Sequence, residues 1–404
     1  MAPPQEEEKK IQLKAQCLCK SETITTSISP SSLPLRGTSC HCTSCRHLTG
    51  ALRSSDAIWP SIVPRDSLKY YPFSPKTGVL FCGTCSSPMF WEDRPFPDAS
   101  PEETTYRVFT GVLSKEMEEG KKPLVKWEHH MFVADTIDGG ATCWLRRMGQ
   151  ADDIQMWMGG IGGSEEITEQ KPWPAIDSLP AARGEGVKGD VKLRCHCGGV
   201  DLVLRAGEAQ KEFSDFAKNK KEGETMPWFV DPVAPHKFLA VQDACDSCRI
   251  WSGGELWTWT FSFLKHLSFT SGEGLPGDTT ELRKAVEEKD PRMGTLGVYA
   301  SSADVQRYHC TRCSASVFYA VDSRPDLVDF AVGLLHSPDG GARAESLLSW
   351  SWGDQIGLRQ DMLGTWREGL LLDAEMEAEE WRAKRGYPVR WAKVAKRKPS
   401  AGNS

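Results

Sequence analysis

The segment Ser39–Gly50, SCHCTSCRHLTG, places Cys40, Cys42 and Cys45 within six positions. Thiolates are common zinc ligands. A structural zinc ion takes four protein ligands, whereas a catalytic zinc ion takes three and leaves one position for water or substrate. The triplet therefore either recruits a fourth ligand from elsewhere in the chain or forms an open site.

The chain has fourteen cysteines, and all except Cys143 lie in C-x-C or C-x-x-C groups. The first ten residues, MAPPQEEEKK, lack the apolar core of a signal peptide. We therefore expect a reducing compartment, the cytoplasm or the nucleus, in which such groups bind metal and do not form disulfides. Cys143 is expected to be a small buried residue.

The cysteine groups occur twice along the chain. Arg46 and Gly50 follow Cys45 at the same distances at which Arg249 and Gly253 follow Cys248. We interpret the pattern as an internal duplication. The first set comprises Cys17, Cys19, Cys40, Cys42, Cys45, Cys82 and Cys85, and the second comprises Cys195, Cys197, Asp243, Cys245, Cys248, Cys310 and Cys313, with Asp243 in the place of Cys40.

The duplication and the composition predict four parts. They are a first zinc domain at 14–165, a linker rich in Pro and Gly at 166–190, a second zinc domain at 191–356, and a C-terminal helix with a basic tail at 357–404. The helix is indicated by the i, i+4 spacing of Met362, Trp366 and Leu370.

The domains themselves are expected to be mainly β. In LWTWTFSFL the aromatic residues alternate with hydroxyl residues, a period of two that predicts a strand with one apolar face, Trp257–Phe263. Sheets with small cores gain stability from a closed metal site.

Spacing alone allows two groupings of the cysteines. Cys17 and Cys19 could share a metal with Cys82 and Cys85, which leaves the triplet open, or with Cys42 and Cys45. Asp243 does not decide between these groupings, because each still leaves four cysteines together in the second set.

The order C-x-C, C-H-C-x-x-C-R, F-C-x-x-C and T-G-x-L resembles the GFA/CENP-V family of glutathione-dependent formaldehyde-activating enzymes and their relatives. The resemblance implies two tandem β-tent domains of twisted antiparallel sheets. It implies structural zinc at Cys17, Cys19, Cys82 and Cys85, with a matching set at Cys195, Cys197, Cys310 and Cys313, and an open, catalytic site at Cys40, Cys42 and Cys45. It also implies carbon–sulfur lyase-type chemistry on an adduct of an aldehyde with glutathione or a similar thiol, such as S-hydroxymethylglutathione.

Three alternatives stay beside this hypothesis. His47 could complete a Cys₃His structural site. Asp243, Cys245 and Cys248 form a harder donor set, and we expect this second open site to have degenerated. The chain could also be a non-catalytic zinc-structured binding module of the CENP-V type, an interpretation supported by the basic residues Arg390, Lys393, Lys396, Arg397 and Lys398.

Charge and hydropathy limit the remaining functions. The net charge of −6 argues against a nucleic-acid partner, because phosphate contacts need clustered Lys and Arg. No run of about 18 apolar residues is present, so we expect no membrane span. His129 and His130 are expected at the surface or at the edge of a pocket.

Overall fold

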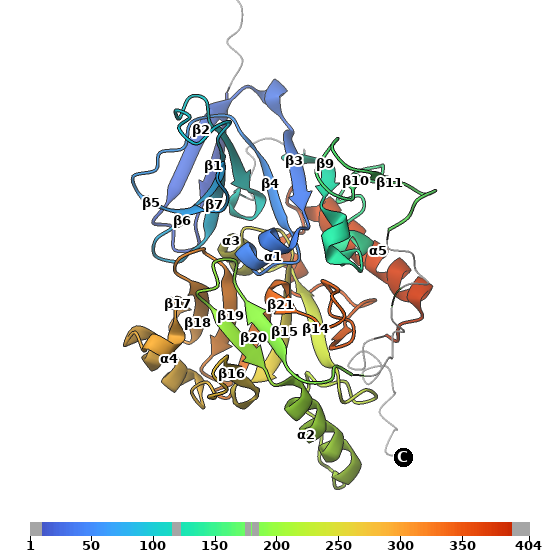
Figure 1. Cartoon of the computed structure of the whole chain (residues 1–404). Helices are drawn as coiled ribbons and strands as arrows, with labels where there is room; N and C mark the ends of the chain where they lie inside the picture. The colour runs from blue at the N-terminus through green and yellow to red at the C-terminus, as the bar shows by residue number, and fades with distance from the viewer. Residues whose placement is uncertain (1–9, 115–122, 174–178, 180–185, 390–404) are drawn as a thin grey trace, which may run out of the picture.

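The computed structural model describes residues 10–114, 123–173, 179 and 186–389. The chain is mainly β, and an 18-residue helix, α5 (Glu368–Arg385), lies near its C-terminal end. Both features were predicted from the sequence. We call residues 10–167 the N-terminal half and residues 191–357 the C-terminal half; they form the upper and lower parts of Figure 1.

The N-terminal half contains a hairpin and a larger mixed sheet. The hairpin joins β1 (Ile11–Gln16) to β2 (Thr23–Ile28). The nine-stranded sheet has the order β11-β10-β9-β3-β4-β8-β7-β6-β5. Its strands are β3 (Leu35–Cys40), β4 (Ser54–Trp59), β5 (Leu68–Pro72), β6 (Thr77–Cys82), β7 (Pro88–Asp93), β8 (Thr105–Phe109), β9 (Val125–Met131), β10 (Gln155–Trp157) and β11 (Glu166–Ile167).

The C-terminal half contains a four-stranded sheet and a seven-stranded sheet. Their orders are β16-β13-β12-β21 and β17-β18-β19-β20-β15-β14-β22. The strands are β12 (Val191–Arg194), β13 (Asp201–Leu204), β14 (Phe238–Asp243), β15 (Trp257–Phe263), β16 (Leu267–Phe269), β17 (Leu296–Ser302), β18 (Val305–Cys310), β19 (Ser316–Val321), β20 (Leu327–Ala331), β21 (Leu335–His336) and β22 (Leu348–Trp350).

The two larger sheets share one strand order. From β9 to β5 the N-terminal sheet runs β9-β3-β4-β8-β7-β6-β5, and the C-terminal sheet runs β22-β14-β15-β20-β19-β18-β17. In both sheets the first pair is parallel and the following pairs are antiparallel. Cys40 pairs with Ser54 as Asp243 pairs with Trp257, so the register also corresponds.

The prediction of a strand at Trp257–Phe263 is confirmed. These residues form β15, in which Thr258, Thr260 and Ser262 are buried together with Trp257, Trp259 and Phe261, while Phe263 is partly buried. The strand lies between β14 and β20 in the interior of the sheet. Both of its faces are therefore covered, and the alternation of residue types does not mark an exposed face.

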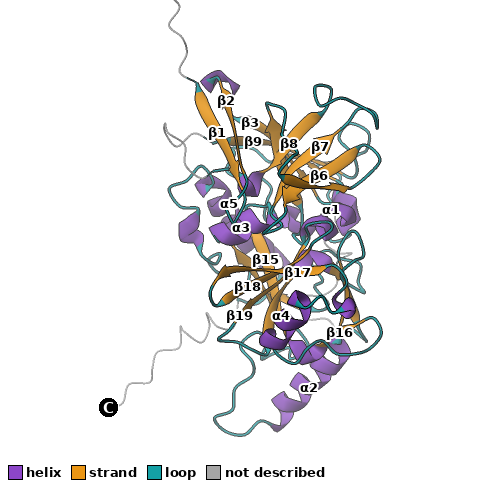
Figure 2. Ribbon diagram, turned by 90° about the vertical axis from the view of Figure 1, so that its left-hand side faces the viewer, coloured by secondary structure: helices purple, strands orange, loops and turns teal. Residues whose placement is uncertain are grey.

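Two short helices meet where the halves join. Helix α1 (Thr43–Thr49) ends at Gly50 and α3 (Asp246–Ser252) ends at Gly253, both with φ of +81°. Gly333 donates a backbone hydrogen bond to Gly50, and Gly111 donates one to Gly253 (2.9 and 2.8 Å). A Cβ at Gly50 would lie 2.3 Å from the Ser316 carbonyl oxygen. Each glycine thus adopts the left-handed conformation that ends its helix and also allows close backbone contact across the junction. Figures 1 and 2 both show α1 and α3 at this junction.

Helix α2 (Ala206–Asn219) lies between β13 and β14, and helix α4 (Thr279–Glu287) lies between β16 and β17. Both connections are longer than those between β2 and β3 and between β4 and β5 in the N-terminal half. Helix α5 begins later than the sequence predicted, because Met362 and Trp366 lie in turns before it. Glu377 of α5 accepts hydrogen bonds from the backbone of Arg146 and Arg147, so the C-terminal helix packs against the N-terminal half.

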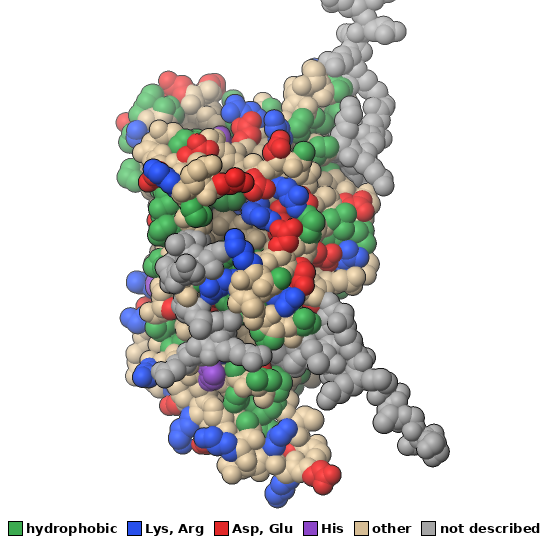
Figure 3. Space-filling model, turned by 90° about the vertical axis from the view of Figure 1, so that its right-hand side faces the viewer, with side chains coloured by type: hydrophobic (Ala, Val, Ile, Leu, Met, Phe, Trp, Pro, Cys, Tyr) green, Lys and Arg blue, Asp and Glu red, His purple; other side chains and the backbone are tan. Residues whose placement is uncertain are grey.

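Acidic and basic side chains alternate over the face drawn in Figure 3 and do not gather in one basic patch. Across the described part of the chain, no helix combines the length and the apolar content that a membrane span needs. Residues 174–178 and 180–185 of the predicted linker lie outside the described residues, as does the basic tail from Arg390 to Lys398. Glu166 and Ile167, at the start of the predicted linker, form strand β11.

Candidate metal centres and ligand cavity

The first four-cysteine group joins two hairpins. Cys17 and Cys19 lie in the turn after β1, Cys82 ends β6, and Cys85 lies in the turn before β7. The four sulfur atoms lie within 4.8 Å of one another. Of the two groupings that the spacing allowed, the structure therefore has the one in which Cys17 and Cys19 join Cys82 and Cys85, and Cys40, Cys42 and Cys45 form a separate group.

The second four-cysteine group has the same construction. Cys195 and Cys197 follow β12, and Cys310 ends β18 and precedes Cys313. These four sulfur atoms also lie within 4.8 Å of one another. The two groups lie near the junction of the halves, since Ser86, beside the first group, donates a hydrogen bond to the Cys310 carbonyl (3.4 Å).

The donor geometry fits a tetrahedral dication. All fourteen cysteines are free thiols. The Sγ–Sγ distances are 3.5 Å for Cys17–Cys19 and 3.6 Å for Cys195–Cys197. Zinc–sulfur bonds of about 2.3 Å in a tetrahedron give sulfur–sulfur edges of about 3.8 Å, close to these values. Each four-cysteine group can therefore hold one metal ion.

Cys40, Cys42 and Cys45, which we call the N-terminal triad, converge between β3 and α1. Their sulfur atoms lie within 4.8 Å of one another. Cys42 is the N-cap of α1, and its sulfur accepts a hydrogen bond from the Cys45 backbone N–H (3.3 Å). The pKa of Cys42 is lowered to about 3, first because the Cys40 thiol donates a hydrogen bond to its thiolate. An ionised sulfur at a helix N-terminus suits a metal ligand.

Within the described residues, the N-terminal triad has no fourth Cys, His, Asp or Glu ligand atom in its group. His47 instead packs its ring against His336 of the C-terminal half, with the ring centroids 4.3 Å apart. This arrangement does not favour His47 as a fourth ligand. Cys143 lies outside every group; it is partly buried, and its sulfur accepts a hydrogen bond from Arg343 (3.0 Å).

A pair of buried histidines lies behind the N-terminal triad. The Nε2 atom of His41 lies 2.9 Å from Nδ1 of His130, and Nε2 of His130 lies 2.7 Å from the Leu145 carbonyl oxygen. Because the carbonyl can only accept, His130 donates to it and in turn accepts from His41. The expectation that His130 lies at the surface or in a pocket is wrong: it is completely buried. Burial lowers the pKa of His130 to about 3.

Asp243, Cys245 and Cys248 form the C-terminal triad, whose ligand atoms also lie within 4.8 Å of one another. Oδ1 of Asp243 accepts from the Cys245 backbone N–H (2.9 Å), and Oδ2 accepts from the Cys248 thiol (3.3 Å). Burial raises the pKa of Asp243 to about 6. The neighbouring Cys248 side chain is the main cause that lowers the pKa of Cys245 to about 5. The aspartate thus takes the place of Cys40 within the group.

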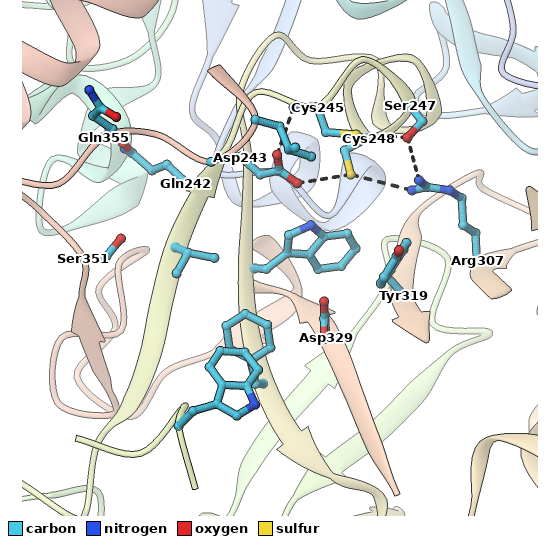
Figure 4. A pocket seen from close by; sticks show the side chains of 16 residues that line it. Gln242, Asp243, Cys245, Ser247, Cys248, Arg307, Tyr319, Asp329, Ser351 and Gln355 are labelled. Atoms are coloured by element: carbon cyan, nitrogen blue, oxygen red, sulfur yellow. Dashed lines mark hydrogen bonds between the residues drawn. The ribbon is translucent and has the colours of Figure 1, made fainter. Parts of the chain in front are cut away.

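A cavity of about 390 Å³ opens in front of the C-terminal triad. In Figure 4 the triad lies at one end, Arg307 and Tyr319 lie on one side, and Ser351 and Gln355 lie on the other. The cavity was not predicted from the sequence. Its lining comes from five strands, from α3 and its N-cap, from the segment between α2 and β14, and from the segment after β22, and no local motif marks these positions.

These features define a mainly β protein built around cysteine groups that can bind metal. Residues 12–135 match the GFA family model, described as glutathione-dependent formaldehyde-activating enzyme. The matched segment includes the first four-cysteine group and the N-terminal triad. No curated protein and no solved structure matches the chain.

Proposed function

We propose that the chain is a zinc-dependent enzyme of the carbon–sulfur lyase type, acting on an adduct of an aldehyde with glutathione or a related thiol. The observation that carries the proposal is the N-terminal triad. Its three sulfurs converge without a fourth ligand from the described residues, inside the segment that matches the GFA family model. The family description names both glutathione and formaldehyde.

The proposal assigns separate roles to the groups. The four-cysteine groups stabilise the two halves, and Cys40, Cys42 and Cys45 hold a catalytic metal ion. A zinc ion in such a site lowers the pKa of a bound thiol or water and polarises an oxygen ligand. The reaction joins the thiol sulfur to the aldehyde carbon, the thiol proton passes to the carbonyl oxygen, and cleavage is the reverse.

We further propose that residues 191–356 are a second copy of the domain at 14–165, and that each copy is a β-tent. The matching strand order of the two larger sheets supports this, as do the matched pairs Cys40–Ser54 and Asp243–Trp257. The exchange of backbone hydrogen bonds through Gly50 and Gly253 gives the junction approximate two-fold character. The free thiols support a reducing compartment such as the cytoplasm.

The test compares two matched variants of the full chain, Cys42→Ala and Cys245→Ala. Both alter the N-cap of a seven-residue helix that follows the same strand position. The assay is the rate at which S-hydroxymethylglutathione exchanges with formaldehyde and glutathione, followed by NMR on zinc-loaded protein.

We expect Cys42→Ala to abolish the acceleration and Cys245→Ala to preserve it. Loss in Cys245→Ala with full activity in Cys42→Ala would move the catalytic centre to the C-terminal half. If neither the wild-type protein nor the variants accelerate exchange, the proposal fails, and the chain is better described as a non-catalytic zinc-structured module.

A further inference from the structure

The cavity at the C-terminal triad differs in chemistry from the corresponding region of the N-terminal half. Strand register makes Trp259 the counterpart of Asp56. Trp259 lies two residues after Trp257, the strand partner of Asp243, and Asp56 lies two residues after Ser54, the strand partner of Cys40. By the same register Asp329 is the counterpart of Arg107. In the N-terminal half Asp56 and Arg107 form an ion pair of 3.5 Å. In the C-terminal half that pair is absent, and an indole occupies one of the two positions.

Aromatic side chains form much of the cavity wall. Trp228, Trp259, Phe261 and Tyr319 all line it. The Trp228 ring lies edge-on to Phe261 with the ring centroids 4.5 Å apart, and Trp228 is 47% exposed, which places it at the rim. Such a wall favours a flat, apolar ligand, because aromatic rings gain both area burial and ring–ring contact.

Arg307 is the one cationic residue among the described residues of the lining, and its side chain already makes contacts within the protein. The Arg307 guanidinium lies between Trp251 and Tyr319, at 5.3 and 5.1 Å from their ring centroids. It donates hydrogen bonds to Ser247 Oγ (2.8 Å) and Ser301 Oγ (3.1 Å), and its Nη1 atom lies 3.7 Å from the Cys248 sulfur. A guanidinium held in this way is not positioned to clamp a carboxylate of a ligand.

The other charged residues of the lining, Asp243 and Asp329, are acidic. Asp329 is already paired with Arg324, which lies outside the lining (2.9 Å). Among the described residues of the lining, a ligand with carboxylates, such as glutathione, would therefore meet no cation that is not already engaged by the protein. The remaining polar residues are neutral, and among them Gln242 is buried with its amide nitrogen lacking a hydrogen-bond partner within the described residues.

We propose that the C-terminal triad and its cavity form a second ligand site, specific for an uncharged aromatic thiol. The thiol sulfur binds at the metal ion held by Asp243, Cys245 and Cys248, and the ring lies against Trp228, Trp259 and Phe261. The site is thereby distinct in specificity from the N-terminal triad. This inference goes beyond the proposed function, because it assigns a metal ion to the C-terminal triad, and it is independent of catalysis.

The experiment is isothermal titration calorimetry of the zinc-loaded full chain with phenylmethanethiol. Phenylmethanol, which lacks the sulfur, and 2-mercaptoethanol, which lacks the ring, are the ligand controls. We expect saturable binding of phenylmethanethiol that is at least about tenfold tighter than that of either control or of glutathione. One ring–ring contact contributes about 0.5–1.5 kcal/mol, a factor of up to about ten in Kd.

Five variants locate the binding. Trp228→Ala should weaken it by about threefold to tenfold, and Trp228→Phe should restore most of the loss. Because Trp228 is half exposed, neither change endangers the fold. Cys245→Ser should abolish binding and remove metal from the C-terminal triad, whereas Cys42→Ser in the N-terminal triad should leave binding unchanged. Phe96→Ala, which removes a ring of similar exposure (46%) outside the cavity lining, should also have no effect.

The proposal is overturned if phenylmethanethiol does not saturate, if glutathione binds as tightly, or if binding persists in both Cys245→Ser and Trp228→Ala. Loss of binding in Cys42→Ser would overturn it as well. Failure of the exchange assay with binding intact would refute the proposed catalysis alone. Unchanged metal content in Cys245→Ser would refute this inference alone.

Discussion

Glu255 makes a buried charged contact across the junction of the halves, and its removal is the sharpest stability test that the structure offers. The side chain is completely buried between α3 and β15. Its Oε2 atom lies 3.5 Å from Nη2 of Arg53 and accepts a hydrogen bond from Ser55 Oγ (3.0 Å). Arg53 is itself buried and also lies over the Trp127 ring.

Glu255→Gln removes the charge with little change of volume and keeps an acceptor for Ser55. It leaves the Arg53 guanidinium buried without its counter-ion, a change that costs about 3–5 kcal/mol in other proteins. The separation of 3.5 Å is longer than an ideal charged hydrogen bond of about 2.8 Å, so we expect the lower end, about 3 kcal/mol.

The assay is urea unfolding of the zinc-saturated full chain, followed by tryptophan fluorescence and by circular dichroism. The matched control is Glu128→Gln, which breaks the Arg36–Glu128 pair at 2.9 Å on the surface, where the side chains are 68% and 24% exposed. Solvent screening limits that loss to about 1 kcal/mol or less. The double variant Arg53→Met/Glu255→Gln leaves no buried charge and should recover much of the stability.

The reasoning would be refuted if Glu255→Gln cost no more than Glu128→Gln, or if the double variant were less stable than Glu255→Gln. Because the pair joins the two halves, the loss should shift the unfolding of both. A shift confined to one of two separate transitions would show that the halves are not coupled through Glu255.

Four further outcomes are expected. Metal analysis of protein prepared without chelators should find at least three zinc ions per chain, and two or fewer would contradict the assignment of the groups. Cys82→Ser should unfold the N-terminal half, because a closed metal site contributes on the order of 10 kcal/mol to folding. Cys42→Ser should leave this half folded. Equal thermal stability of the two variants would argue against a closed structural site at Cys82 and an open site at Cys42. Gly253→Ala should lower the free energy of unfolding by about 1–3 kcal/mol, because φ is +81° and the new Cβ would lie 2.9 Å from Phe109. Denaturant unfolding measures this loss. Burial raises the pKa of Asp329 to about 6, so the folded state binds a proton that the unfolded chain has already lost above about pH 4. The stability relative to Asp329→Asn should therefore fall by about 2 kcal/mol as pH rises from 4 to 6. A constant difference between the two proteins across that range would show that the carboxyl is not desolvated.

The cysteine groups were predictable because each half of a site is local in the chain. A C-x-C or C-x-x-C pair places two sulfurs close together whatever the rest of the fold does. The pairing of Cys17 and Cys19 with Cys82 and Cys85 could not be derived from spacing, since it spans more than sixty residues. It depends on the turn after β1 meeting the turn between β6 and β7.

The sequence by itself determined the repeated ligand pattern, the mainly β character and the glycines that end α1 and α3, because these depend on short-range geometry. The tertiary structure decided which side chains face one another. Trp259, Arg307 and Asp329 lie on three different strands, and only sheet register brings them to one cavity beside Asp243. The same strand position holds Asp56 in one half and Trp259 in the other, so the architecture is shared while the chemistry of the wall is not.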